Sequence, residues 1–175
     1  ERGEVCGNHS EEKRPCQIAL TEADKKRIKP HLSKMAHYCS MQERAVSDIL
    51  LKLRSAPLSD DDKNHIVATL KKEGFLDEAR YARAFANDKF KLNQWGRIKI
   101  GYALRMKQVD SATIEEGLEQ IDEGDYQELI TSLATRKLKD TRSSSTADRN
   151  NKIARFLLQR GFESDLVWKT IQALP

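Results

Sequence analysis

One apolar pattern occurs twice in this chain, at a constant offset of 53 residues. Placing Ile100 on Ile153 also places Leu104 on Leu157, at the spacing of a helix face. The same offset pairs Lys107 with Arg160, Val109 with Phe162, Ile114 with Val167 and Leu118 with Ile171. The pattern therefore predicts one helical unit that is used twice. A repeated helical unit builds an extended surface rather than an enclosed pocket, which favours binding over catalysis.

The composition fits an array of small units around a continuous core. Charged residues make up 33% of the 175 residues and aromatic residues only 6%, so the surface is large relative to the core. No stretch alternates apolar and polar residues as a strand does. We predict an all-α fold of three tandem three-helix repeats in an elongated, curved array. An extra N-terminal helix and a flexible leader precede the repeats.

Breaks in the helical pattern divide the chain into five segments. They are a leader (1–20), an N-terminal helical segment (21–40) and three repeats (41–92, 93–140 and 141–175). The leader is polar and has no helical period, and Pro30 should end or kink the first helix. A run of hydroxyl residues within 140–150 predicts a surface loop, so the next helix is expected from Asn151. One alternative stays open, in which the helix expected at 123–139 belongs to the third repeat instead of the second.

Several helix ends are marked by residues suited to capping. Thr21, Ser59 and Asp77 can accept hydrogen bonds from backbone N–H groups at the start of a helix. The carboxylates at 60–62 fit the first turn of the helix that begins after Ser59, where they face the positive end of the helix dipole. This role explains them without a metal site or an acid catalyst. Gly74 suits a left-handed helix end, with apolar residues directly after it.

Other residue patterns exclude several functional classes. Three cysteines form no dense disulfide framework, and no apolar run resembles a signal peptide or a membrane span, so we expect a reduced, cytoplasmic setting. Cys6, His9 and Cys16 fit no zinc spacing and lack a fourth ligand, so no metal site and no cofactor are predicted. No nucleophile with its base and no glycine-rich phosphate loop is found, so we predict that the protein is not an enzyme.

Basic residues gather where the repeated pattern begins. Segment 81–100 carries five basic residues against Asp88, and segment 141–160 carries five against Asp148. The intervening segment 101–140 has a net charge of −4, although the whole chain has +4. Two separated basic clusters predict a partner with negative charge, because clustered cations set up a local attractive field.

Rows of basic residues at helical spacing are the candidate binding sites. Arg97, Gly101 and Arg105 are four residues apart and should share a face away from the apolar stripe. Trp95 could stack on a base or a partner, or it could be a hydrophobic staple before the helix. Arg149, Lys152 and Arg155 make a second row beside Ile153 and Phe156. The alternative for both rows is a solvated face with no partner. The candidate partner- or nucleic-acid-binding residues are Lys89, Lys91, Trp95, Arg97, Lys99, Arg105, Arg149, Lys152 and Arg155.

Four short strings, taken in order, resemble the RecX family of recombination regulators. They are LKKEGFLD at 70–77, RYARAF at 80–85, WGRIKI at 95–100 and RGF at 160–162. The resemblance spans about 38–174, which that family folds as three tandem three-helix units. It implies a non-enzymatic protein that binds the RecA recombinase filament on DNA and inhibits or modulates its ATPase and strand-exchange activities.

Two other functions also fit these residues. The basic clusters would also suit an autonomous protein that binds single- or double-stranded DNA through phosphates. A helical adaptor for another acidic protein is the third possibility. For each of them we expect a monomer that does not contact membranes.

The chain departs from the family pattern at the end of the 97–107 helix. Gln108 stands where that family has a helix-ending glycine, as found here at Gly74 and Gly161. A residue other than glycine costs about 1 kcal/mol in a left-handed ending, so a differently built turn is expected there. Lys63 also stands where that family has an apolar residue after the acidic first turn, at a position expected to bear on packing between the first two units.

Overall fold

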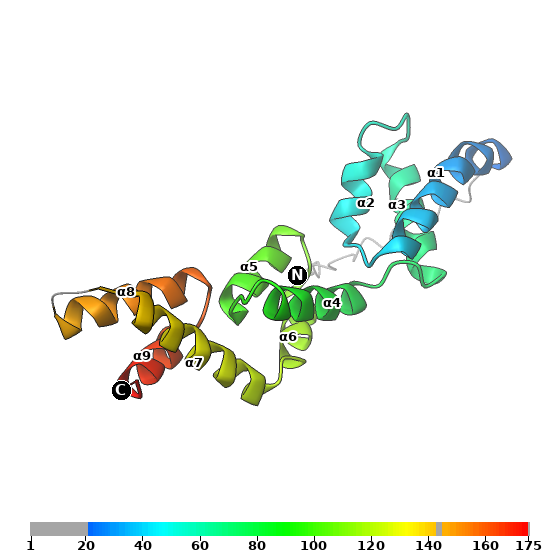
Figure 1. Ribbon diagram of the computed structural model, residues 1–175. Coiled ribbons are helices and arrows are strands. Elements are labelled where there is room, and N and C mark those ends of the chain that lie inside the picture. Colours follow the sequence, from blue (N-terminus) through cyan, green and yellow to red (C-terminus); the bar gives the residue numbers. More distant parts are fainter. Residues whose placement is uncertain (1–20, 143–144, 175) are drawn as a thin grey trace, which may run out of the picture.

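The computed structural model describes residues 21–142 and 145–174, and the regular structure in these ranges is entirely helical, which confirms the predicted class. The predictions for the leader 1–20 lie outside the described residues. Figure 1 shows the helices as three groups that follow one another in an elongated, curved row. The helices are α1 (Glu22–Met41), α2 (Val46–Leu53), α3 (Asp60–Lys72), α4 (Glu78–Lys91), α5 (Arg97–Met106), α6 (Ser111–Glu119), α7 (Glu123–Asp140), α8 (Thr146–Gln159) and α9 (Ser164–Gln172).

The predicted caps are found at their helix starts. The side chains of Thr21, Ser59 and Asp77 each accept a hydrogen bond from the backbone N–H three residues later. In the first turn of α3, Asp62 is buried and also accepts two hydrogen bonds from Arg27 of α1, at 2.9 and 3.0 Å. These hydrogen bonds hold the pKa of Asp62 below its usual value. The acidic run at 60–62 is thus part of the contact between α1 and α3.

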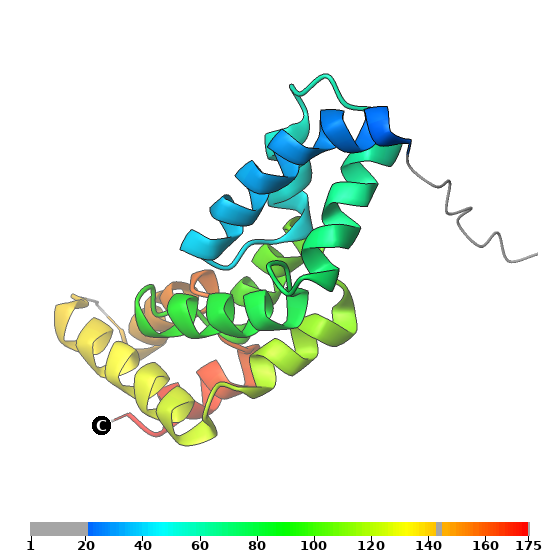
Figure 2. The same cartoon turned by 90° about the vertical axis from the view of Figure 1, so that its right-hand side faces the viewer.

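One of the two outcomes expected at Pro30 is found, and one predicted helix boundary is wrong. Helix α1 continues through Pro30 without ending there, and Figure 2 shows it bent along its length, which agrees with the predicted kink. Helix α8 begins at Thr146, so the loop predicted over 140–150 is shorter than expected. The reason is a cap: the Ser145 side chain accepts from the backbone N–H of Asp148 at 3.1 Å. One of the hydroxyl residues that indicated a loop therefore starts the helix.

The helices group differently from the predicted repeat boundaries. Helix α3 packs on α1 and α2, α4 packs mainly on α6 and also on α5, and α7 packs on α8 and α9. Helices α4 and α6 pack closely because Gly117 of α6 has no side chain. A Cβ there would lie 3.0 Å from the Cβ of Ala82 in α4. The helix expected at 123–139 thus packs with the third unit, as the open alternative proposed. Helix α4, placed in 41–92 from the sequence, packs with the second unit.

The described residues form two apolar clusters. One lies among α1–α3 and centres on fully buried residues such as Ile49, Ile66 and Leu70. The other is shared by α4–α9, with Ala45 as the contribution from before α2. The second and third bundles therefore have one continuous core, whereas the first bundle has its own.

The repeated pattern occupies equivalent places in α5–α6 and α8–α9. Ile100, Leu104, Ile153 and Leu157 are all fully buried. Gln108 has a φ of 62°, in the same left-handed region as Gly74 at 77° and Gly161 at 86°. The expectation of a differently built turn at Gln108 is therefore wrong. A shared hydrogen bond explains the common geometry, because Phe75, Val109 and Phe162 each donate their N–H to the carbonyl five residues earlier.

Candidate partner interface

Two of the strings that carry the family resemblance meet in space and join the second bundle to the third. The N–H of Gly96 donates to the carbonyl of Arg160 at 2.8 Å, and the N–H of Ile98 donates to the carbonyl of Gly161 at 3.1 Å. A Cβ on Gly96 would lie only 2.2 Å from the oxygen of Gly161. The start of α5 thus rests directly on the turn between α8 and α9, which fixes the two basic clusters relative to each other.

A buried tyrosine reinforces this joint. The hydroxyl of Tyr126 in α7 accepts from the N–H of Arg97 at 2.9 Å and donates to Glu163 at 2.8 Å. The ring of Tyr126 also contacts Phe90 and Phe162, with ring centroids 5.9 and 5.3 Å apart. Burial raises the pKa of Tyr126 well above its ordinary value, so the hydroxyl keeps the proton that it donates.

Arg97 is used within the fold rather than presented to solvent. Its guanidinium lies 4.1 Å from the centroid of the Tyr126 ring and pairs with Glu123 at 2.8 Å. The same guanidinium donates to the carbonyl of Ile121 at 3.3 Å. This candidate contact residue therefore ties α5 to the start of α7, and its positive charge is partly neutralised within the chain.

The row predicted at Arg97, Gly101 and Arg105 does not form one exposed face. Gly101 is buried, and a Cβ there would lie 3.6 Å from side-chain carbons of Ile114 and Leu118. The sequence placed Gly101 with its charged neighbours because a glycine carries no hydrophobic signal. Arg105 is exposed, as is Lys91 at the end of α4.

Trp95 is half-buried and packs against the shared core. The Nζ atoms of Lys89 and Lys99 lie 5.4 and 4.6 Å from the centroid of its ring. These cation–π contacts account for the tryptophan and for two candidate cations within the fold. The arrangement supports the staple interpretation of Trp95 over stacking on a partner.

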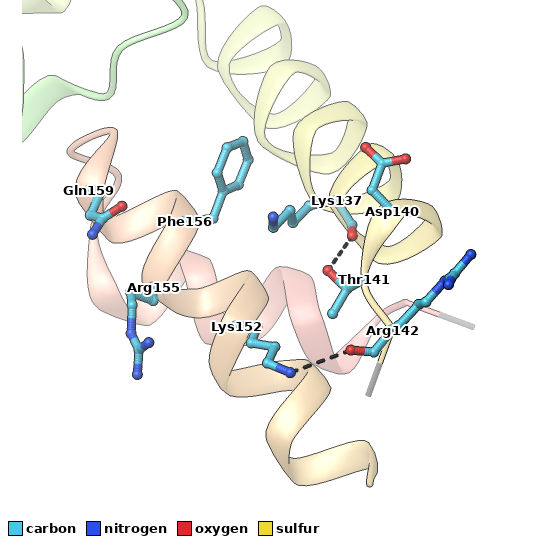
Figure 3. Close-up of a pocket in the computed structure, with 8 residues that line it drawn as sticks. All are labelled: Lys137, Asp140, Thr141, Arg142, Lys152, Arg155, Phe156 and Gln159. Atoms are coloured by element: carbon cyan, nitrogen blue, oxygen red, sulfur yellow. Dashed lines mark hydrogen bonds between the residues drawn. The ribbon is translucent and has the colours of Figure 1, made fainter. Parts of the chain in front are cut away.

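The second basic cluster lines an open cleft between α7 and α8 (Figure 3), with a volume of about 370 Å³. The lining residues are Lys137, Asp140, Thr141, Arg142, Lys152, Arg155, Phe156 and Gln159. Four of these side chains are cationic and one is acidic. Several cations in the cleft could therefore contact one anionic group of a partner, such as a phosphate or a carboxylate.

Contacts within the cleft hold part of its wall in place. Lys152 donates to the carbonyl of Arg142 at 3.4 Å and pairs with Asp148 at 2.7 Å. The Thr141 hydroxyl donates to the carbonyl of Lys137 at 2.6 Å. The Nζ of Lys137 lies 5.5 Å from the centroid of the Phe156 ring, which forms an apolar part of the lining. Arg155 is exposed and projects from α8 beside these groups (Figure 3).

The structure brings together only part of the predicted row in α8. Lys152 and Arg155 line the cleft, whereas Arg149 does not, and its buried Nε makes no hydrogen bond to the described residues. Sequence reasoning did not select Lys137 or Arg142 as contact residues. Arg142 belongs to the basic segment 141–160 and could have been found from it. Lys137 lies in a segment of negative net charge, so only the packing of α7 on α8 identifies it.

The described residues contain no group of three or more His, Cys, Asp and Glu side chains arranged to hold a metal ion. The candidate ligands Cys6, His9 and Cys16 lie outside the described residues. Within 21–142 and 145–174, no helix is both long enough and apolar enough to cross a membrane. Cys39, in α1, is buried as a free thiol.

Two family models match this chain, and together they cover just over half of it. The model described as "RecX, second three-helix domain" matches residues 77–118, which contain α4, α5 and all but the last residue of α6. The model described as "RecX, third three-helix domain" matches residues 124–171, which contain most of α7–α9. The two matched ranges agree with the grouping of helices by their contacts.

Known proteins of similar sequence carry the same family name and are named as regulatory proteins. "Regulatory protein RecX" of Clostridium botulinum is 35% identical over 127 residues, which is 71% of this chain and 58% of that protein. The Finegoldia magna protein of the same name is 30% identical over 134 residues, 74% of this chain and 64% of that protein. The chain thus spans about half to two thirds of the length of these relatives.

Solved structures share the fold. A crystal structure of regulatory protein RecX superposes with a TM-score of 0.78 and 25% identity, over 89% of this chain and 81% of that one. The structure of RecX from Lactobacillus salivarius gives a TM-score of 0.77 with 24% identity, over 84% of this chain and 96% of that one.

Proposed function

We propose that this chain, which belongs to the RecX family of regulatory proteins, binds the filament that a RecA recombinase forms on DNA and modulates its activities. The expected effect is inhibition or modulation of ATP hydrolysis and strand exchange during DNA repair and recombination. The protein acts without a cofactor, in the cytoplasm, as a monomer.

The observation that carries this proposal is the basic cleft between α7 and α8 on a rigidly joined pair of bundles. The joint at Gly96 and Gly161 keeps this cleft at a fixed distance from the cations of α4 and α5. A filament repeats its anionic groups at fixed spacings, so a rigid array of cationic sites can match it with little loss of conformational freedom on binding. The cleft then contacts phosphate or carboxylate oxygens of the filament.

A charge reversal in the cleft tests this role. Arg142→Glu combined with Arg155→Glu should weaken binding to the RecA filament about tenfold or more, because both exposed guanidiniums would be replaced by carboxylates. Helicity should be unchanged, since neither side chain supports the core. The matched control is Lys26→Glu with Lys29→Glu, which makes the same charge change at exposed positions of α1 and should leave affinity within about twofold. Equal losses in the two variants would contradict a specific role for the cleft.

A second assay separates filament regulation from plain DNA binding. If the protein acts on the filament, it should suppress DNA-dependent ATP hydrolysis by its cognate recombinase well below the concentration at which it shifts naked DNA in a gel. Equal potency in the two assays would favour the autonomous DNA-binding function, because sequestration of the DNA would then explain the inhibition. Absence of any inhibition or filament binding would refute the proposal.

A further inference from the structure

Helix α5 exposes a straight line of large apolar side chains. Ile98, Tyr102 and Met106 are 55%, 61% and 67% exposed, and they follow one another at four-residue intervals. At 1.5 Å per residue, the line runs for about 12 Å along the helix. Exposed apolar residues scattered singly are ordinary, but three in line on one helix face mark a candidate contact surface.

Two cations border this line. Residues seven apart are separated by nearly two helical turns and lie almost above one another. Arg105 therefore lies beside Ile98 on one side of Tyr102, and Lys99 lies beside Met106 on the other side. We call these five residues the α5 face: Ile98, Lys99, Tyr102, Arg105 and Met106. The face combines tyrosine, methionine and arginine, which are residue types enriched in protein–protein interfaces.

The charge of the α5 face is not balanced by the described part of the chain. Helix α5 contains no acidic residue. Its first arginine pairs with Glu123, and Lys107, just beyond its end, pairs with Asp48 at 2.6 Å. Lys99 and Arg105 have no acidic partner among residues 21–142 and 145–174. Arg105 therefore remains available beside the apolar line, whereas Lys99 also donates to the carbonyl of Gln159 at 3.4 Å and lies over the Trp95 ring.

The fold itself does not require apolar residues on this face. The 53-residue offset that superposes the two buried patterns places Ile98 on Asn151, Tyr102 on Arg155 and Met106 on Gln159. The equivalent positions of α8 are thus polar or charged, although both helices pack into the same core. The apolar line is a property of α5 alone, and it has no partner within the described chain.

We propose that the α5 face binds an amphipathic helix of the recombinase that carries carboxylates beside its apolar residues. The straight line at four-residue intervals fits the apolar face of another helix, and the bordering cations select acidic neighbours on it. A second copy of this chain pairing through the same face would bring Lys99 and Arg105 against like charges. DNA phosphates would gain nothing from the apolar line. This inference rests on the proposed function and names the chemistry of the partner.

The test uses the full chain with Ile98→Ser, Tyr102→Ser and Met106→Ser together, titrated onto the cognate RecA filament on single-stranded DNA and onto the same DNA alone. The triple variant should bind the filament about tenfold or more weakly and bare DNA within about twofold of the unaltered chain. The matched control is Met41→Ser, which removes an apolar side chain that is 72% exposed in the first bundle and should change neither affinity. Arg105→Glu should weaken filament binding, and Arg105→Lys should retain it.

Each other outcome has a defined meaning. If the unaltered chain binds the filament and the triple variant binds it equally well, the α5 face is not the contact and this inference fails while the proposed function stands. If the unaltered chain does not bind the filament, the proposed function fails first. Sedimentation that shows a dimer of the unaltered chain and a monomer of the triple variant would identify a second copy as the occupant, which would also overturn the inference. Circular dichroism confirms that the variants compared are folded.

Discussion

The helix pairs α5–α6 and α8–α9 have the same buried pattern but different surfaces. Ile100 and Ile153 are equally buried, and both pairs turn through a left-handed residue, Gln108 in one and Gly161 in the other. On the outside, α5 carries an apolar line with two cations, whereas α8 lines a basic cleft. Core register and surface chemistry therefore vary independently in the two pairs, so the sequence repeat predicts the fold of both pairs but not which of them contacts a partner.

The two pairs also take unequal parts in the joint between them. Gly96 begins α5 and rests on the turn that follows α8. The residue equivalent to Gly96 at the 53-residue offset is Arg149, and α8 begins about one turn earlier than α5. The copies are therefore equivalent in their cores and distinct in their first turns.

The largest expected effect comes from filling the joint. Gly161→Ala should lower the free energy of unfolding by at least about 3 kcal/mol, because the new Cβ would lie 2.3 Å from the Cβ of Lys99 and 2.5 Å from its backbone nitrogen. Gly74→Ala is the matched control, since Gly74 is also left-handed but has open space around its Cα. It should cost only about 1 kcal/mol. Equal losses in urea denaturation would show that the close approach does not stabilise the fold.

Truncating equivalent core residues tests whether the two cores are alike. Leu104→Ala and Leu157→Ala should each cost about 3 kcal/mol, because both side chains are fully buried and each truncation leaves a cavity. Chemical denaturation of the two variants under the same conditions measures the losses. A small loss in one and a large loss in the other would break the proposed equivalence.

Removing the hydroxyl of Tyr126 should have a smaller effect. Tyr126→Phe leaves the N–H of Arg97 and the carboxylate of Glu163 without this partner, so we expect a loss of about 1–2 kcal/mol. Tyr102→Phe is the control, because Tyr102 is exposed and its hydroxyl can bond to water. Thermal unfolding of both variants gives the comparison, and an unchanged midpoint for Tyr126→Phe would argue against the hydroxyl as a link between the bundles.

The smallest predicted effect is a gain. Gln108→Gly should stabilise the chain by up to about 1 kcal/mol, because glycine adopts the observed φ of 62° without steric cost. The gain is reduced by the greater freedom of glycine in the unfolded state. A loss of stability in denaturation would mean that the Gln108 side chain makes a contribution beyond its backbone conformation.

Much of the fold could be predicted from the sequence because its signals are local. The caps at Thr21, Ser59 and Asp77 and the left-handed ending at Gly74 each depend on a few neighbouring residues. The repeated apolar pattern likewise identified residues that are buried. The start of α8 was missed because Ser145 can signal either a loop or a cap.

The site was less predictable because it depends on contacts between distant segments. Charge and spacing selected Arg97, but its pairing with Glu123 and Tyr126 requires the packing of α7 beside α5. Lys137 contributes to the cleft although its own segment is acidic overall. The apolar line on α5 was visible at four-residue spacing, yet only its exposure separates it from a core stripe.

The most direct measurement is the affinity of the intact chain for the RecA filament and for bare single-stranded DNA at one salt concentration. The unaltered chain, the triple serine variant of the α5 face and the double glutamate variant of the cleft are compared side by side. We predict that the unaltered chain prefers the filament, that the α5-face variant loses this preference while keeping its affinity for DNA, and that the cleft variant binds the filament more weakly. Equal affinity of the unaltered chain for filament and bare DNA, with parallel losses in both variants, would contradict the account.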